Sequence, residues 1–159
     1  MTIEIELTQG YKALVSDRHA EKIAGINFWA EKKKDGRVYA RGRISGKQKY
    51  LHVFLMQPPP GMLVDHVDGN GLNCVDENMR ICNDAENAMN RKISGNNSIG
   101  YKGVVVRDRK RPFRAKIVFN SKVINIGCFN DPEAAARAYD AKARELFGEF
   151  ARLNFPDEA

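Results

Sequence analysis

The stretch that decides the fold is residues 62–82, MLVDHVDGNGLNCVDENMRIC. It begins with three apolar residues that lead into Asp65 and His66, and it ends with a second short run at 79–82. Between the two runs, DGNG at 68–71 is a strong turn signal, because glycine and asparagine accept the backbone angles of tight turns. The stretch therefore predicts a strand, a polar loop and a return strand.

A helix is expected directly after these strands. Asn83 suits the N-cap, and Glu86 three residues later completes a capping box, so the helix should run to about Ile93. Residues 94–100 are polar and contain glycine, which is typical of a linker. The pattern therefore predicts a first domain at 1–93, a linker at 94–100 and a second domain at 101–157.

The second domain has the clearest pattern. Residues 113–119 alternate strictly between an apolar face and a face that carries basic side chains. Asp131 caps a helix with Pro132 in its first turn, and Gly148 ends that helix. Further strands are expected at 102–107 and 123–129. Together these elements predict a three-stranded sheet with one face covered by the helix and the other bare and basic.

The first 50 residues are expected to form a small antiparallel sheet. Apolar and polar residues alternate near the N-terminus, and an Asp35-Gly36 turn favours a hairpin. The expected strands lie at 3–7, 11–16, 26–31, 37–44 and 47–52. Residues 51–56 fit either a strand end or a short helix. The fold class expected for the whole chain is α+β.

The composition is that of a globular protein without membrane segments. The chain has 159 residues, 43% of them hydrophobic, and a formal net charge of +6 from 26 basic and 20 acidic residues. No run approaches the ~18 apolar residues of a membrane helix, and the acidic start lacks the features of a secretory signal. Three widely spaced cysteines support neither a disulfide framework nor a CxxC zinc site. We therefore expect a cytoplasmic, intracellular protein.

The positive charge is concentrated in two blocks. Residues 1–58 carry 11 basic and 6 acidic groups, and residues 101–122 carry 8 basic groups and 1 acidic group. The stretch between them, 59–92, is acidic, with 3 basic and 6 acidic groups. A basic surface can neutralise phosphates and carboxylates can hold a hard cation, although a basic block is also common as a solvated face.

Four side chains could form a catalytic site. Asp65 offers an anionic oxygen and Asn87 an amide oxygen, both suited to Mg²⁺ or Mn²⁺, and His66 could take a proton from water. Asn78 begins the return strand. The alternative is that Asp65 and Asn78 cap turns and His66 is an ordinary surface residue. Because adjacent strand residues point to opposite faces, Asp65 and His66 share a site only if the backbone departs from a regular strand there.

This region resembles the HNH homing endonucleases of phages and bacteria, in the H-N-N form. The resemblance is carried by residues 51–52, 64–70, 77–80 and 86–87. It implies a ββα-metal finger at about 62–93 in a phage- or bacterium-encoded protein. The implied activity is metal-dependent hydrolysis of DNA by a homing-type enzyme, with a single motif that could nick one strand and leave a 3′-hydroxyl and a 5′-phosphate.

The resemblance also implies a role for each residue. His66 would be the general base, Asp65 and Asn87 would ligate one divalent cation, Mg²⁺ or Mn²⁺, and Asn78 would brace the loop that orients the base. His52 also matches a family position, and we interpret it as a structural residue behind the site. Asparagine at 87, where many relatives carry histidine, disfavours nickel or zinc at that position because imidazole suits those metals better.

A second resemblance, to the AP2 DNA-binding domain, covers residues 101–156. It is carried by residues 101–104, 126–129, 135–140 and 153–156, and it implies that the bare sheet face binds the major groove of double-stranded DNA. The positions that are predicted to contact DNA are Lys102, Arg107, Lys116 and Asn125, with Arg109, Lys110, Arg111 and Arg114 as phosphate contacts. Arg91 lies four residues after Asn87 and is predicted to face the same DNA backbone. For each of these, a solvated side chain is the alternative.

Two other functions are consistent with the sequence. A non-catalytic, sequence-preferring DNA-binding regulator would use the finger only as structure. An RNA-binding protein fits the charge, but Phe113 and Phe119 fall on the buried face of the sheet, which leaves no aromatic platform for stacking bases. On the main interpretation the partner is double-stranded DNA, bound by a monomer rather than a dimer and without a membrane.

Overall fold

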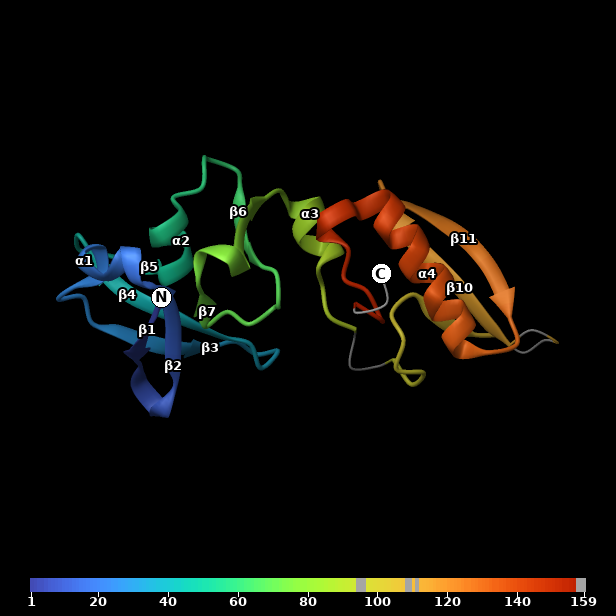
Figure 1. Cartoon of the computed structure of the whole chain (residues 1–159), viewed down its shortest axis with the longest axis horizontal. Coiled ribbons are helices and arrows are strands. Elements are labelled where there is room, and N and C mark those ends of the chain that lie inside the picture. The colour runs from blue at the N-terminus through green and yellow to red at the C-terminus, as the bar shows by residue number, and fades with distance from the viewer. Residues whose placement is uncertain (94–96, 108–109, 111, 157–159) are drawn as a thin grey trace. The chain divides into compact units, whose positions relative to one another are not determined.

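The protein is a mixed α+β chain that divides into two compact units, Met1–Asp84 and Ala85–Ala159 (Figure 1). The computed structural model describes residues 1–93, 97–107, 110 and 112–156. Residues 94–96 of the expected linker, the predicted phosphate contacts Arg109 and Arg111, and the expected domain end at 157 lie outside the described residues. Within the described part of the chain, no helix is long and apolar enough to cross a membrane.

The first unit begins with a three-stranded sheet in the order β1-β2-β7. The strands are β1 (Thr2–Glu6), β2 (Lys12–Ser16) and β7 (Asn73–Cys74). β1 and β2 are antiparallel, whereas β7 joins β2 in parallel through the pairs Leu14↔Asn73 and Val15↔Cys74. We did not expect β7, because a strand of two residues is too short to show any alternation of apolar and polar side chains.

A second sheet of the first unit has the order β3-β4-β5, so the single N-terminal sheet expected from the sequence is in fact two. The strands are β3 (Phe28–Lys32), β4 (Val38–Ile44) and β5 (Lys47–Tyr50). Both pairs are antiparallel hairpins. Ala40, Gly42 and Ile44 are buried, as the alternation in β4 indicates. The ambiguous segment after β5 is a helix, α2 (Leu51–Met56).

Residues 62–82 contain a two-stranded antiparallel sheet, formed by β6 (Leu63–His66) and β8 (Met79–Cys82). The following helix, α3 (Asp84–Met89), is shorter than expected and ends four residues before Ile93. A helix of six residues has few internal hydrogen bonds and depends on packing for its stability. All of α3 except its first residue belongs to the second unit. The short helices of the first unit are η1 (Thr8–Gly10), η2 (Asp17–His19), α1 (Ala20–Ile23), α2 and η3 (Asp76–Asn78).

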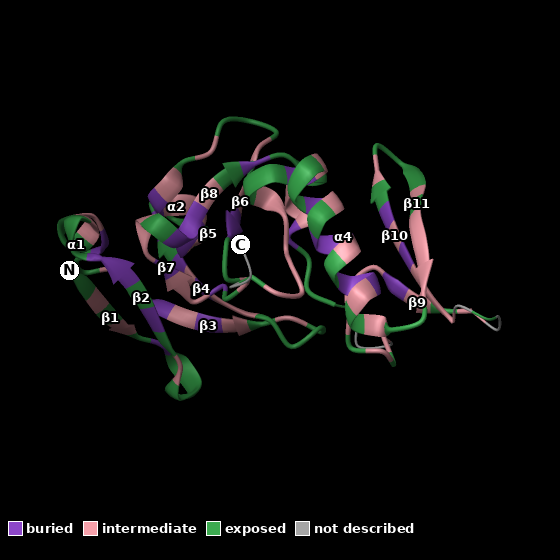
Figure 2. Cartoon of the chain, turned by 45° about the vertical axis from the view of Figure 1, so that its right-hand side comes forward, coloured by how far each residue is buried: buried purple, intermediate pink, exposed green. Residues whose placement is uncertain are grey.

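The core of the first unit joins the two N-terminal sheets to α2. Val15, Leu51 and Cys74 have essentially no exposed surface and come from β2, α2 and β7. In Figure 2 the buried residues run along β2 and across β3 and β4. Because Cys74 belongs to this core, the loop that follows β6 is anchored at its far end by hydrophobic packing.

The second unit contains the sheet β11-β10-β9 and the helix α4. The elements are β9 (Val104–Val106), β10 (Phe113–Phe119), β11 (Lys122–Phe129), α4 (Pro132–Phe147) and η4 (Gly148–Phe150). Asp131 caps α4 by accepting a hydrogen bond from the Ala134 N–H at 2.7 Å. α4 lies along one face of the sheet (Figure 1), where Ala115 and Ile117 pack against its buried residues.

Candidate functional site

The hairpin of β6 and β8 carries Asp65 and His66 at the end of its first strand. Asp65 lies opposite Arg80 and His66 lies opposite Met79, with no register shift in the pairing. The backbone is therefore a regular strand through His66, and the polar loop begins only at Val67. In such a strand the side chains of Asp65 and His66 leave from opposite faces.

Asp65 is held by a buried ion pair that the sequence analysis did not anticipate. Its Oδ2 accepts hydrogen bonds from Arg80 Nη2 at 2.8 Å and from Arg80 Nε at 3.0 Å. The two side chains are only 8% and 14% exposed. The position of Arg80 in the sequence could have indicated this pair. Arg80 lies on the return strand directly across from Asp65, where opposite charges stabilise each other.

His66 points into the interior of the first unit and is 5% exposed. Its ring centroid lies 4.9 Å from that of His52 and 6.1 Å from that of Tyr39, and its Nε2 lies 3.8 Å from the sulfur of Cys74. Burial lowers the pKa of His66, and the negative charges of Asp68 and Asp65 only partly oppose this effect. The imidazole is therefore neutral at pH 7.

Asn78 spans the loop that follows His66. Its Oδ1 accepts the N–H of Asp68 at 3.0 Å, and its Nδ2 donates to Asp68 Oδ1 at 3.0 Å and to the Asn73 carbonyl at 2.7 Å. The Val67 N–H donates to the Asn78 carbonyl at 2.9 Å. One buried amide thus connects both ends of the loop, which fixes the backbone on the C-terminal side of His66.

Asp68 is the acidic centre of the same loop. Partial burial opposes its ionisation, but hydrogen bonds from the Asn70 N–H and from the side chains of Asn73 and Asn78 outweigh this and lower its pKa. Asp68 therefore stays charged at neutral pH. Its charge acts on both His66 and the buried thiol of Cys74.

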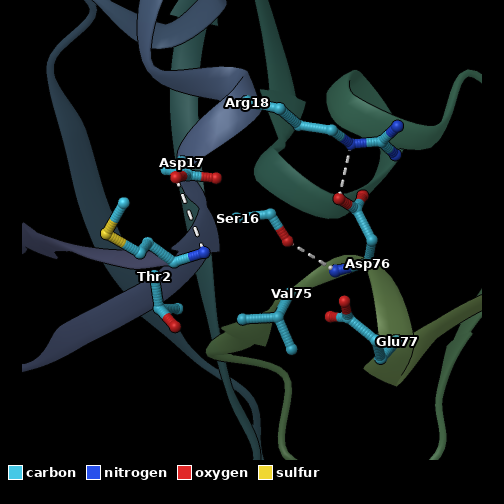
Figure 3. Close-up of a pocket in the computed structure, with 8 residues that line it drawn as sticks. Thr2, Ser16, Asp17, Arg18, Val75, Asp76 and Glu77 are labelled. Atoms are coloured by element: carbon cyan, nitrogen blue, oxygen red, sulfur yellow. Dashed lines mark hydrogen bonds and ion pairs between the residues drawn. The ribbon is translucent and has the colours of Figure 1, made fainter.

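The short helix η3, which ends at Asn78, is anchored on the first sheet through Asp76. The Asp76 N–H donates to Ser16 Oγ at 2.9 Å, and its carboxylate accepts from Arg18 and lies 2.9 Å from His19 Nε2. Figure 3 shows this polar pocket, with Ser16 and Arg18 directed at Asp76. His19, which matched no sequence motif, therefore supports the loop that carries Asn78.

His52 lies beside His66 rather than on the surface. It is 8% exposed, its ring stacks on Tyr50 with centroids 5.4 Å apart, and its buried Nδ1 has no hydrogen-bond partner. Burial, with a smaller contribution from His66, lowers the pKa of His52 to about 3. One nitrogen of each of His52 and His66 and the sulfur of Cys74 all lie within 4.8 Å of one another.

Asn87 and the predicted DNA-contacting residues belong to the second unit. Asn87 is half-buried on α3, and Arg91 is exposed just beyond this helix. The ammonium of Lys102 is not on the sheet surface, because it donates to the Met89 carbonyl at 2.7 Å. Burial lowers the pKa of Lys102 to about 8, and the nearby positive charge of Arg152 adds to this effect.

The face of the β9–β11 sheet opposite α4 is open, and we call it the open sheet face. Arg114 and Lys116 lie on it, with Asn125 directly across from Lys116. Val118 and Val123 form an exposed apolar pair at its far end, at 58% and 57% exposure. The face therefore offers positive charge, an amide and an apolar patch side by side. Arg107 follows β9 and is half-buried.

Asn154 joins the segments that border this sheet. Its backbone N–H donates to both oxygens of the buried Asp140 carboxylate at 2.9 Å. Its side chain accepts the N–H of Lys102 at 2.6 Å and donates to the Lys102 carbonyl at 3.2 Å. One asparagine thus ties the C-terminal segment to α4 and to the chain that precedes β9.

Two known proteins resemble the chain over 60% of its length. It is 35% identical over 96 residues to a protein of Acanthamoeba polyphaga mimivirus named uncharacterized HNH endonuclease L560, and the match spans 49% of that protein. It is 34% identical over 95 residues to protein 3.8 of Escherichia phage T7, of which the match spans 78%. The chain belongs to the family of phage T7 protein 3.8. No protein-family model matches it.

The structure of this protein 3.8 family member adds residues that the motif did not reveal. Arg80 pairs with Asp65, Asp76 anchors η3, and Cys74 lies next to His66. These contacts join segments that are eight to sixty residues apart in the chain. Neither alternation nor motif spacing reports such contacts, because they depend on how the two sheets and the loop pack.

Proposed function

We propose that the chain is a metal-dependent DNA endonuclease of the HNH type. The observation that carries the proposal is its 35% identity to a protein named an HNH endonuclease. One feature of the structure supports it: a single buried asparagine fixes the loop that follows His66. The regular strand through Asp65 and His66 weighs against a shared site, because it directs the two side chains to opposite faces. The mimiviral protein is about twice as long as the matched region, so the activity proposed here is that of the chain alone.

The proposed catalytic domain covers residues 1–93, with β6, β8 and α3 as its ββα-metal finger. Residues 94–100 form the linker, and residues 101–157 are an AP2-like DNA-binding domain. The order of β9, β10, β11 and α4, with α4 on one face of the sheet, supports the second assignment. So does Asn154, which connects three of the segments that resemble that family.

Asp65 and Asn87 are the proposed ligands of one Mg²⁺ or Mn²⁺ ion. Carboxylate and amide oxygens are hard donors that fit either cation. The Oδ2 of Asp65 already accepts two bonds from Arg80, so a cation bound there shares this carboxylate with a guanidinium. When bound, the cation stabilises negative charge on the leaving oxygen of a phosphodiester.

The chain's own residues supply the base and its support. His66 is neutral at pH 7, because burial lowers its pKa, and can therefore accept a proton from the attacking water. Asn78 orients it by fixing Val67 and Asp68, the two residues that follow. His52 packs against the ring of His66 and limits its rotation. We propose hydrolysis to a 3′-hydroxyl and a 5′-phosphate, with homing-type nicking by a monomer.

DNA would be bound mainly by the open sheet face. Arg114 and Lys116 supply positive charge for phosphate or guanine, and the amide of Asn125 suits adenine. Arg107 and Arg91 are proposed phosphate contacts. Lys102 remains a predicted contact, although it would first have to release the Met89 carbonyl.

Plasmid nicking tests this function. The whole chain is incubated with supercoiled DNA and Mg²⁺, and we expect conversion to the open-circular form that stops when the metal is chelated. His66→Ala should slow nicking at least 100-fold, which is the lower range for loss of a general base. Asp65→Asn should also lose activity, whereas Asp35→Asn, which removes the same charge from the exposed β3–β4 turn, should not. Equal rates for the wild type and His66→Ala would refute the assignment of the base.

Two observations favour the second candidate, a non-catalytic DNA-binding regulator, in addition to the regular strand that directs Asp65 and His66 to opposite faces. The carboxylate of Asp65 is already paired with Arg80, and His66 is 5% exposed. A regulator would bind DNA with an affinity that falls steeply as salt rises and would cut no DNA with Mg²⁺ or Mn²⁺. Binding without cleavage on a randomised DNA library would select this candidate over the nuclease.

A further inference from the structure

Three potential metal ligands converge beside the proposed catalytic residues. His52 lies on α2, His66 at the end of β6 and Cys74 on β7, and their side chains belong to the interior of the first unit. We propose that His52, His66 and Cys74 form a binding site for one Zn²⁺ ion. This site shares no ligand with the proposed oxygen site of Asp65 and Asn87, although His66 follows Asp65 directly in the chain.

The separation of two of the three ligand atoms is close to that in a tetrahedral zinc site. With Zn–S near 2.3 Å and Zn–N near 2.05 Å, tetrahedral angles separate a sulfur and a nitrogen ligand by about 3.6 Å. The observed separation between His66 Nε2 and Cys74 Sγ is 3.8 Å. The atoms of all three residues lie within 4.8 Å of one another. Side-chain movements of about 1 Å would therefore bring the three ligands to bonding distance.

The ligands are held in place by structure that does not depend on a metal. Cys74 is fixed by the parallel pair Val15↔Cys74, and the adjacent Asn73 carbonyl accepts a bond from Asn78. The ring of His52 is stacked on Tyr50 at an interplanar angle of 12°. A site in which the protein fold orders the ligands in advance binds an ion with less loss of entropy.

The surroundings favour a cation. Nδ1 of His52 is buried without a hydrogen-bond partner, which is unusual for a polar atom in a protein interior. The charge of Asp68 acts on both His66 and Cys74, and that of Asp65 also acts on His66. Asp68 therefore places a negative charge near two of the three ligands, which favours a cation there.

The donor set selects zinc over magnesium. Thiolate and imidazole are the preferred ligands of Zn²⁺, whereas Mg²⁺ prefers oxygen. A cysteine thiol gives up its proton when it becomes a zinc ligand, because the thiolate is the form that binds. Binding therefore forms a Zn–S bond and breaks the S–H bond, and the proton passes to solvent.

The site gives the chain a way of being inhibited, and this consequence rests on the proposed function. His66 is the proposed general base, and the lone pair that would accept a proton is the one that would bind zinc. Zn²⁺ bound to His66 should therefore stop hydrolysis even when Mg²⁺ is saturating.

Cobalt replaces zinc as the probe, because Co²⁺ bound to a thiolate gives a charge-transfer band in the near ultraviolet. The whole chain, titrated with Co²⁺ alone, should develop this band to a stoichiometry of one, and Zn²⁺ should abolish it. Cys74→Ser should lose the band, and Cys128→Ser, which changes a half-buried cysteine of the second unit, should keep it. Absence of the band in the wild type, or its loss only in Cys128→Ser, would overturn the proposal.

A second variant and a second readout separate this proposal from the nuclease assignment. His52→Gln should weaken Co²⁺ binding at least tenfold, and the fluorescence of Trp29 in β3 verifies that each variant is folded. In the plasmid assay each protein is compared with itself with and without Zn²⁺, and Cys74→Ser should need at least tenfold more Zn²⁺ for half-inhibition. If no protein nicks DNA, the nuclease assignment fails while the cobalt spectrum still decides the metal site. Zinc bound at this site with undiminished nicking would contradict the role of His66 as base.

Discussion

Asn78 offers the sharpest test of how the loop after β6 is built. Asn78→Ala removes three hydrogen bonds at a position that is 8% exposed, one of them to the charged carboxylate of Asp68. With about 1 kcal/mol for each neutral bond and about 2 kcal/mol for the charged one, the expected loss of stability is about 3–4 kcal/mol. The fraction of unfolded molecules should therefore rise by a factor on the order of a few hundred.

Urea unfolding, followed by the fluorescence of Trp29, measures this loss in the correct unit, since the single tryptophan lies in β3. The midpoint should fall by roughly 1–4 M urea. Asn27→Ala, at an exposed asparagine of the first unit, is the matched control and should change stability by less than about 0.5 kcal/mol.

Asn78→Asp separates loss of the side chain from loss of its N–H donors. It keeps the size and an acceptor for the Asp68 N–H, but it removes both donated bonds and places a second carboxylate beside Asp68. At pH 7 it should be at least as unstable as Asn78→Ala and should recover as the pH falls and one of the carboxyls takes a proton. A loss below 1 kcal/mol for Asn78→Ala, or wild-type stability for Asn78→Asp, would refute the view that this amide holds the loop.

Three further predictions follow from other contacts. Gly71→Ala should destabilise the first unit by about 1–3 kcal/mol, measured by unfolding in urea. The reason is that an added Cβ would lie 2.4 Å from the ring of Tyr39 and 2.6 Å from the Val38 carbonyl oxygen. An unchanged midpoint would show that the loop moves freely. The hydrogen bond from Arg18 holds the pKa of Asp76 well below its usual range. This carboxylate therefore stabilises the fold above about pH 4, and the stabilisation is lost as the pH falls further. Thermal unfolding from pH 6 to pH 2 should show that Asp76→Asn loses less stability in acid than the wild type does. Burial lowers the pKa of Lys102 to about 8. Between pH 8 and about 10.4 the unfolded chain therefore binds more protons than the folded chain, and the free energy of unfolding should rise with pH across this range. Lys102→Met should reduce that rise, and a pH profile identical to that of the wild type would contradict the prediction.

The two proposed metal sites differ in the chemistry of their ligands although they meet at neighbouring residues. Asp65 faces Arg80 across the hairpin, while His66 faces His52 and Cys74 in the interior. A regular strand separates the two side chains by pointing them to opposite faces. One strand end can therefore present a carboxylate oxygen on one side and an imidazole nitrogen on the other, so the two proposed sites would bind different metals.

The sequence alone was sufficient to place the strands and helices whose local residue pattern agrees with their packing. β10 spans the residues expected for it, α4 begins after the expected Asp131 cap, and β6 and β8 pair around the expected polar loop. Alternation with period two and the capping residues determine these elements, because each depends on side chains a few positions apart.

Only the tertiary structure decided how the loop and the interior of the first unit are arranged. Two-residue β7 exists because β2 supplies a parallel partner, and this pairing brings Cys74 to His66. The ammonium of Lys102 turns toward a carbonyl thirteen residues away instead of facing the open sheet surface. Contacts of this kind depend on the three-dimensional packing of segments that are distant in sequence. A pattern with a period of two or 3.6 residues does not predict them, because it depends only on residues that are close in the chain.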